Sequence, residues 1–167
     1  VWGLFLLCDW WFPLPMAALH RQPAMIVTDR DGTPLRIFLP GDEQLRIPVT
    51  LGAVAPVFVR ALIASEDRWF YHHPGVNPFA IVRALGANIR HGRVVSGAST
   101  IPMQIGRMAE PKSRTLWSKC WEVFRALQLE WHLNKDQLLE LYLNPTPYGG
   151  NVEGIGAAAH VYFGKTP

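Results

Sequence analysis

The chain has 167 residues and a formal net charge of +3, with 49% hydrophobic and 17% charged residues. This composition argues against a disordered segment, and the length suits one domain with its own core. Because there is no dense run of lysine or arginine, we expect no nucleic-acid partner, although the charge suits a site for an anionic headgroup. Cys8 and Cys120 lack the spacing of a disulfide framework or a metal site.

The first segment is apolar. Residues 1–14 contain one charged side chain, Asp9, and carry tryptophans at both ends, as interfacial anchors often do. The segment is shorter than the roughly 20 residues that span a bilayer. We expect residues 1–17 to be the end of a membrane anchor that continues outside this chain; an ordinary buried segment is the alternative.

Short strands are expected next. Residues 24–28 and 35–39 are rich in apolar and β-branched side chains and flank Asp-Arg-Asp-Gly at 29–32, which indicates a hairpin turn. A third strand is expected at 45–49. We therefore interpret residues 18–50 as a β-rich linker.

The rest of the chain has helical patterns. Pro56 suits the start of a helix that reaches Glu66, and Asn77-Pro78 starts a second helix that Gly92 ends. Residues 92–104 are predicted to form a polar loop able to face an anion, with a flexible linker as the alternative. The fold class is therefore mainly α with a short N-terminal β-hairpin.

Further helices are expected toward the C-terminus. Residues 114–131 predict a long helix with an apolar face, and Asn134 with Gln137 resembles a capping box for the next. A last helix is expected at 154–163. The apolar face of the long helix comprises Trp117, Cys120, Trp121, Phe124, Leu127 and Trp131, and the next helix is expected to turn Leu138, Leu139, Tyr142 and Leu143 inward.

The strongest candidate for chemistry is the charge cluster where the first helix of the body ends. Glu66, Asp67 and Arg68 lie beside three aromatic residues. Aromatic surroundings disfavour a charged carboxylate and Arg68 favours it, so the two acids can differ in proton affinity and act as acid or base. A solvated charge cluster is the alternative. His72 and His73 are adjacent and are not expected to bind zinc together.

A second charged row lies on the long helix. Lys119, Glu122 and Arg125 recur every three residues, which predicts a cation, a carboxylate and a cation along one side. A solvated ion-pair face is the more common explanation of such a row.

Five segments in this order resemble the motifs of the peptidoglycan glycosyltransferases, the polymerase domain of class A penicillin-binding proteins. Glu-Asp-Arg-Trp-Phe-Tyr-His-His-Pro-Gly at 66–75 is similar to the family's Glu-Asp-x-x-Phe-x-x-His-x-Gly, and Gly-Ala-Ser-Thr-Ile-Pro-Met-Gln at 97–104 to Gly-x-Ser-Thr-Ile-x-x-Gln. The other three segments are 119–122, 135–144, and Tyr148 with 154–165. The amino-acid sequences at 74–79 and 125–133 are most similar to those of penicillin-binding proteins of the 1C type.

The resemblance implies a lysozyme-like helical domain, at residues 51–167 and incomplete at its C-terminus, that polymerises lipid II. It makes Glu66 the general base and gives Glu122, with basic residues, a role in pyrophosphate departure. Implied substrate-binding residues are Asp67, Phe70, Ser99, Thr100, Gln104, Arg107, Arg114 and Lys119. Glu140, Tyr142 and Asn144 would hold the cleft walls together, and His73 would be a structural turn residue.

The resemblance also implies partners and a location. The partners are lipid II, the growing glycan strand and the bacterial inner membrane, with a single N-terminal anchor and the catalytic domain in the periplasm. No Ser-x-x-Lys occurs, so the transpeptidase domain is missing from this chain. No cofactor is required; a divalent cation, Mg²⁺ or Mn²⁺, near Glu122 stays open, and no metal ligand is assigned.

Some positions depart from the family pattern. Ala98 replaces a glycine, Pro102-Met103 replaces a polar pair, and Ser118 replaces an arginine, which weakens the expected cationic clamp. Two other functions remain: a non-catalytic module that binds lipid II or a partner, and a lytic transglycosylase or muramidase. The cations Arg107, Arg114 and Lys119 argue against the lytic enzyme, which handles no pyrophosphate.

Overall fold

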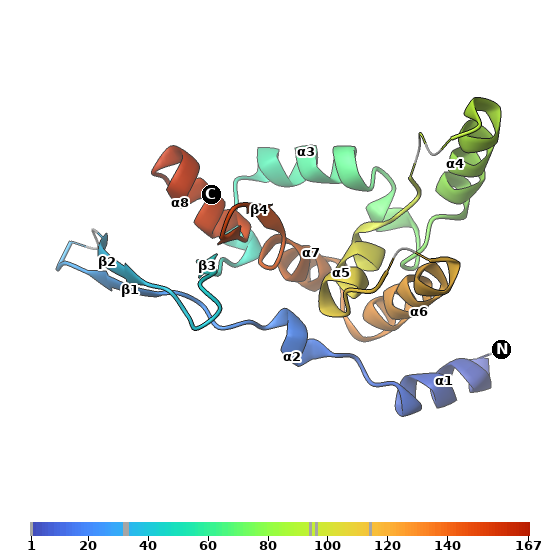
Figure 1. Cartoon of the computed structure of the whole chain (residues 1–167), viewed down its shortest axis with the longest axis horizontal. Coiled ribbons are helices and arrows are strands. Elements are labelled where there is room, and N and C mark those ends of the chain that lie inside the picture. Colours follow the sequence, from blue (N-terminus) through green and yellow to red (C-terminus); the bar gives the residue numbers. More distant parts are fainter. Residues whose placement is uncertain (1, 32–33, 94, 96, 114) are drawn as a thin grey trace.

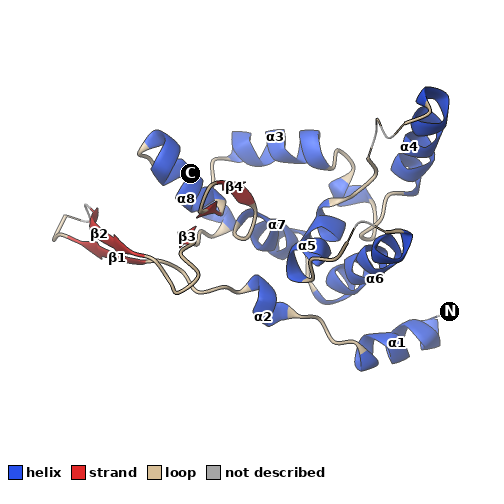
Figure 2. Ribbon diagram, viewed as in Figure 1, coloured by secondary structure: helices blue, strands red, loops and turns tan. Residues whose placement is uncertain are grey.

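The computed structural model describes residues 2–31, 34–93, 95, 97–113 and 115–167. The chain is mainly helical, as predicted, and its described strands form a two-stranded and a three-stranded sheet (Figures 1 and 2). The α-helices are α1 (Trp2–Trp11), α2 (Met16–Leu19), α3 (Pro56–Glu66), α4 (Pro78–His91), α5 (Ile101–Ala109), α6 (Leu116–His132), α7 (Lys135–Leu143) and α8 (Ile155–Phe163). The strands are β1 (Met25–Thr28), β2 (Pro34–Phe38), β3 (Leu45–Arg46), β4 (Pro147–Gly149) and β5 (Val152–Glu153), and 3₁₀ turns occupy η1 (Leu51–Ala53) and η2 (Phe70–His72).

The core lies where α5, α6 and α7 pack together, in the middle of the molecule (Figure 1). Apolar burial is the main source of stability in such a core. The four positions expected to face inward on α7 are all buried, so that prediction is confirmed. Fully buried members of the core are Phe70, Ile101, Ile105, Leu138 and Leu139.

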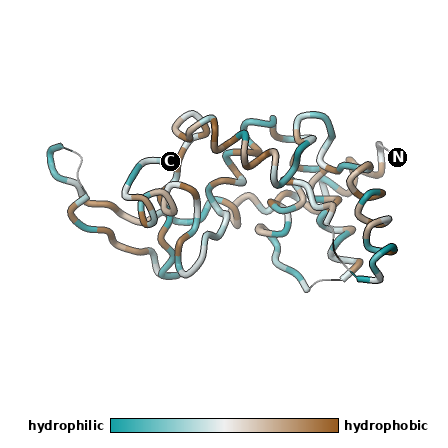
Figure 3. The backbone as a smooth tube through the Cα atoms, turned by 90° about the horizontal axis from the view of Figure 1, so that it is seen from above, coloured by the Kyte–Doolittle hydropathy of each residue, from teal (hydrophilic) through white to brown (hydrophobic). Residues whose placement is uncertain are grey.

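The N-terminal hairpin is confirmed. β1 pairs with β2 in antiparallel register, with Met25 opposite Phe38, and the hairpin projects from the helical body with a hydrophilic tip (Figure 3). The strand predicted at 45–49 is wrong beyond Arg46. Pro48 has no N–H for a ladder, and the N–H of Val49 donates instead to Asn144 Oδ1 at 2.9 Å.

The helix limits set by local signals are confirmed for α3 and α4. α3 has proline in its first turn and ends at Glu66. Asn77 caps α4 by accepting from the N–H of Ala80 at 3.0 Å, and Gly92 ends it with a φ of 61°. The apolar side chains of Phe79 and Ile89 recur at helical spacing on α4. They are 87% and 72% exposed, so the described residues do not cover this apolar face.

The loop predicted at 92–104 is wrong over its last four residues. Thr100 is the N-cap of α5 and accepts from the N–H of Met103 at 3.4 Å, with Pro102 in the first turn. Ile101 and Gln104 therefore belong to a helix, because a capping threonine followed by proline starts one.

The apolar face predicted for α6 is wrong for Trp117, Cys120 and Trp131, which are exposed. The helix begins after Thr115, in a capping box with Ser118. The buried face instead includes two polar side chains, Arg125 and Gln128, at 4% and 0% exposure. Their burial is stable because each has hydrogen-bond partners.

Arg125 also departs from the predicted charged row. Its Nε donates to Glu110 Oε2 at 2.7 Å, and its Nη1 donates to the carbonyl oxygen of Phe12 at 2.8 Å. The row of three charges is therefore reduced to the pair of Lys119 and Glu122. Arg125 instead links α6 to the segment that follows α1.

The N-terminal helix α1 lies against α6. The rings of Phe5 and Phe124 are 6.3 Å apart, those of Phe12 and Trp121 are 5.4 Å apart, and Asp9 pairs with His132 at 3.0 Å. The outer side of α1 carries Trp10 and Trp11, at 76% and 70% exposure. Within the described part of the chain, no helix combines the length and the apolar character that crossing a bilayer requires.

Candidate active site

The first two motifs meet in one cavity of about 350 Å³. Its walls come from the end of α3, the start of α4 and the segment that precedes α5. The residues lining it are Ala64, Ser65, Glu66, Asp67, Arg68, Trp69, Asn77, Phe79, Ala80, Arg83, Gly97, Ala98, Ser99 and Thr100. Segments more than 30 residues apart are therefore joined in one site.

Glu66 lies at the C-terminal end of α3 with its side chain exposed. Gln104 Nε2 donates to Glu66 Oε2 at 3.0 Å, and the hydroxyl of Tyr142 donates to Gln104 Oε1 at 3.3 Å. The carboxylate is thus held by one oxygen and accessible from solvent. An exposed, oriented carboxylate is the arrangement that a general base needs.

Two tyrosines lie close to this carboxylate. Burial, followed by the nearby charge of Glu66, raises the pKa of Tyr142 to about 12. The same two causes, burial first, raise the pKa of Tyr148. Both phenols are therefore neutral at physiological pH and keep their protons for hydrogen bonds.

Asp67 lies below the surface of the site, at 6% exposure. Its carboxylate accepts from the N–H of Ile101 at 3.0 Å and contacts His73 Nε2 at 2.9 Å. Nδ1 of His73 is buried and has no hydrogen-bond partner among the described residues. Asp67 therefore ties the end of α3 to the start of α5, which fixes the neighbouring Glu66.

Two further predicted substrate-binding residues also lie inside the protein. Phe70 is 0% exposed and belongs to the core. Thr100 is 2% exposed, and its hydroxyl donates to the carbonyl oxygen of Gly75 at 2.5 Å. Like Asp67, both side chains therefore make their contacts inside the protein.

The third motif contributes an ion pair at the first turns of α6. Lys119 Nζ lies 2.6 Å from Glu122 Oε2 and donates to Ser99 Oγ at 2.7 Å. The Lys119 side chain is 46% exposed and that of Glu122 is 12% exposed. The cation therefore reaches solvent while the carboxylate orients it.

The segment leading into α5 joins the two halves of the site. Ser99 contacts Lys119 and Gln104 contacts Glu66, five residues apart along the chain. Arg107 lies one turn further along α5 and is exposed. Burial is the main cause that raises the pKa of Tyr142, and the charge of Arg107 is close enough to oppose that rise in part. Arg114, the remaining predicted cation, lies outside the described residues.

No zinc is expected at His72 and His73, and a divalent cation near Glu122 is the question left open. That carboxylate is already paired with Lys119. Among the residues that the structure describes, no group of three His, Cys, Asp or Glu side chains is placed to hold one metal ion. The described donors therefore do not fit a metal ion held by the protein alone.

Sequence reasoning interpreted the fourth motif as the structural wall of the cleft. Two of its members fit that interpretation, since Glu140 accepts from the N–H of Leu51 at 2.8 Å and Asn144 from the N–H of Val49. Tyr142 differs, because its hydroxyl reaches Gln104 and so touches the site. The sequence signal was weak: a tyrosine among leucines on a buried helix face resembles an ordinary core residue.

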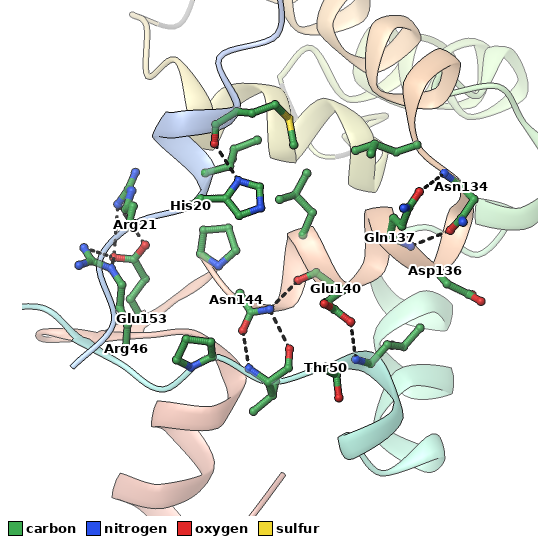
Figure 4. A pocket seen from close by; sticks show the side chains of 18 residues that line it. His20, Arg21, Arg46, Thr50, Asn134, Asp136, Gln137, Glu140, Asn144 and Glu153 are labelled. Atoms are coloured by element: carbon green, nitrogen blue, oxygen red, sulfur yellow. Dashed lines mark hydrogen bonds and ion pairs between the residues drawn. The ribbon is translucent and has the colours of Figure 1, made fainter. Parts of the chain in front are cut away.

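A second cavity, of about 600 Å³, lies between α2, the linker and α7 (Figure 4). None of the predicted catalytic or substrate-binding residues lines it, whereas Glu140 and Asn144 of the fourth motif do. Some of its labelled polar groups pair with one another, including Arg46 with Glu153 at 2.8 Å and Asn134 with Gln137 at 2.9 Å. Glu66 is not among the residues that line this cavity.

The fold and the paired carboxylate and cation groups fit one class of protein. A family model described as Transglycosylase matches residues 31–167, and the chain belongs to this family of glycosyltransferases.

Particular relatives are similar over much of the chain. Penicillin-binding protein 1C of Escherichia coli (strain K12) is 48% identical over 166 residues, which are 99% of this chain and 21% of that protein. Penicillin-binding protein 1A of the same strain is 49% identical over 126 residues, 74% of this chain and 15% of that protein. Penicillin-binding protein 1A of Aquifex aeolicus (strain VF5) is 42% identical over 123 residues, 73% of this chain and 17% of that protein. The chain thus spans about a fifth of the relatives' length.

Proposed function

We propose that this chain is a peptidoglycan glycosyltransferase that polymerises lipid II, with Glu66 as the general base. The observation that carries the proposal is the carboxylate of Glu66, exposed beside the cavity and held by Gln104 at 3.0 Å. A sugar hydroxyl becomes a strong nucleophile as its proton passes to such a group. The similarity to penicillin-binding proteins supports this choice of substrate.

The hydroxyl oxygen of the acceptor sugar attacks the anomeric carbon of the donor, and its proton moves to the carboxylate of Glu66. The bond from that carbon to the lipid pyrophosphate breaks, and its electron pair leaves with the phosphate oxygen. One glycosidic bond forms, and lipid pyrophosphate is released.

The leaving group becomes more negative as that bond breaks, so cations near it stabilise the transition state. Lys119 is the best-supported candidate, because Ser99 and Glu122 hold its ammonium group at 2.7 Å and 2.6 Å while the side chain stays exposed. Glu122 assists pyrophosphate departure by orienting Lys119. Arg107 and Arg114 supply further positive charge.

We also propose a location and partners. The catalytic domain, residues 51–167, would face the periplasm, joined through the linker at 18–50 to an inner-membrane anchor whose end is residues 1–17. The growing glycan strand would be the second substrate. A transpeptidase domain would belong to the whole protein. The match covers only 21% and 15% of the two Escherichia coli relatives, which supports further domains in the whole protein.

The test is polymerisation of lipid II in detergent by the whole protein that contains this chain, with Glu66→Gln and a control, Glu43→Gln. Glu43 is exposed and lies in the turn before β3, away from the cavity. We expect polymer from the wild type and the control but none from Glu66→Gln, with unchanged thermal unfolding. Normal polymerisation by Glu66→Gln would refute the assignment of the base.

The same preparation separates the other two functions. Lipid II that is bound but never polymerised by the wild type would favour a binding module. Cleavage of preformed glycan strands would favour a lytic enzyme.

A further inference from the structure

The side chains of Glu66, Gln104 and Tyr142 form a hydrogen-bonded relay that crosses three helices. Gln104 on α5 lies between the carboxylate on α3 and the phenol on α7, at 3.0 Å and 3.3 Å. Tyr142 is 5% exposed and packs in the core with α5 and α6. The relay therefore begins at the buried side chain of Tyr142 and ends at the exposed carboxylate of Glu66.

The chemistry of the groups determines the direction of the relay. An ionised carboxylate only accepts hydrogen bonds, so the Gln104 atom that faces it must be Nε2. Oε1 of the same amide then faces Tyr142, whose hydroxyl must donate. Reversing the amide would set Oε1 against the carboxylate, two acceptors in contact without a proton between them.

The direction depends on whether Glu66 carries a proton. A protonated Glu66 is able to donate to Oε1 of a reversed amide, whose Nε2 would then donate to the phenol oxygen. The reversed amide would take away Oε1, the acceptor of the Tyr142 hydroxyl proton, so Tyr142 favours the orientation that presents the Nε2 donor to the charged carboxylate. Because the phenol of Tyr142 stays protonated up to a pKa of about 12, it is able to donate throughout the working pH range.

We propose that Tyr142 is a positioning residue that acts through Gln104 to keep Glu66 ionised and oriented for proton abstraction. This inference rests on the proposed function for its role in catalysis, but the relay itself is a property of the free protein. Other groups that face the relay are Arg107 from α5 and Tyr148 from β4, and Asp67 and Arg68 follow Glu66 in the chain.

The test uses Tyr142→Phe in the whole protein, which removes only the hydroxyl group that donates to Gln104. It compares the pH dependence of lipid II polymerisation by this variant with that of the wild type. We expect the acid limb of the kcat profile to move up by about half a pH unit, the size of one modest hydrogen bond. The KM for lipid II should change less than twofold. Gln104→Leu should move the acid limb in the same direction, and the double variant should add no further shift.

A matched control is Tyr71→Phe, which removes an exposed phenol that faces Asp136 at the other end of α7. The control should keep the wild-type profile. A drop in rate by the same factor at every pH for Tyr142→Phe would overturn the inference, because it would indicate loss of packing alone. No change in that variant would overturn it too.

A second measurement needs no activity. The side-chain amide signals of ¹⁵N-labelled Gln104 should follow a titration in the wild type, and its midpoint should move up in Tyr142→Phe. An unmoved midpoint refutes the relay. Absence of polymer from the wild type would instead refute the proposed function, and the amide titration would still decide the relay.

Discussion

Replacing Gly75 by alanine places a methyl group where the structure has no room for one. Gly75 ends the first motif with a φ of +90°, a conformation that L-residues rarely adopt. An added Cβ would lie 2.6 Å from the carbonyl oxygen of Ala126 and 2.9 Å from its carbon. Both are backbone atoms of α6, so the collision cannot be relieved by a side-chain rotation.

The magnitude follows from two effects. A positive φ costs a non-glycine residue about 1–2 kcal/mol. Overpacking adds typically about 1–3 kcal/mol. The Gly75→Ala variant should therefore lose roughly 2–5 kcal/mol of unfolding free energy, which lowers the melting temperature by roughly 5–20 °C in a chain of this size. Because the carbonyl oxygen of Gly75 accepts from Thr100, the start of α5 should shift as well.

The assay is urea unfolding followed by circular dichroism, with Gly41→Ala as the control. Gly41 has no neighbour within 4 Å of an added Cβ, so this change should stay within about 0.5 kcal/mol. A loss below about 1 kcal/mol for Gly75→Ala would show that α6 yields to the methyl group, and would refute the reasoning.

Three further outcomes are expected. Asp67→Asn should lower the unfolding free energy by roughly 1–3 kcal/mol in urea titrations, because it replaces the buried carboxylate that contacts His73 and accepts from the N–H of Ile101. An unchanged midpoint would argue that this network adds no stability. Lys119→Ala should lower kcat/KM for lipid II roughly tenfold, and Lys119→Arg should restore part of it, in steady-state polymerisation assays; equal values for both variants would exclude a role for the charge. Burial raises the pKa of Glu110, but hydrogen bonds from Arg125 and Trp121 outweigh burial and hold that pKa below its ordinary value of 4.5. Stability from this group is therefore present above pH 4.5 and lost as pH falls through the lower folded value, and Glu110→Gln should flatten that acid slope in thermal unfolding.

Local signals were enough to predict most helix limits. Proline at the start of α3, Asn77 before α4, Gly92 after it, and the capping box of Asn134 with Gln137 each satisfy or end backbone hydrogen bonds within a few residues. Such interactions depend on neighbours in the chain, so the sequence alone contains them. The same holds for the motifs that indicated the family.

The error on α6 has a different cause. A periodic apolar pattern predicts a buried face only where a partner covers it. Trp117 and Trp131 fit the period and are exposed, whereas Arg125 is buried because Glu110 and the segment after α1 supply its partners. Those partners lie 15 and 113 residues away, beyond the few residues over which helical periodicity pairs side chains.

The sequence by itself determined the helical character of the chain, the family to which it belongs and the candidates for its chemistry. Only the tertiary structure decided which candidates are exposed to solvent. Glu66 and Lys119 are exposed, while Asp67 and Thr100 are buried and held by partners from other elements. The physical reason is that capping and periodicity act over one or two helical turns, whereas burial and charge pairing depend on which elements pack together.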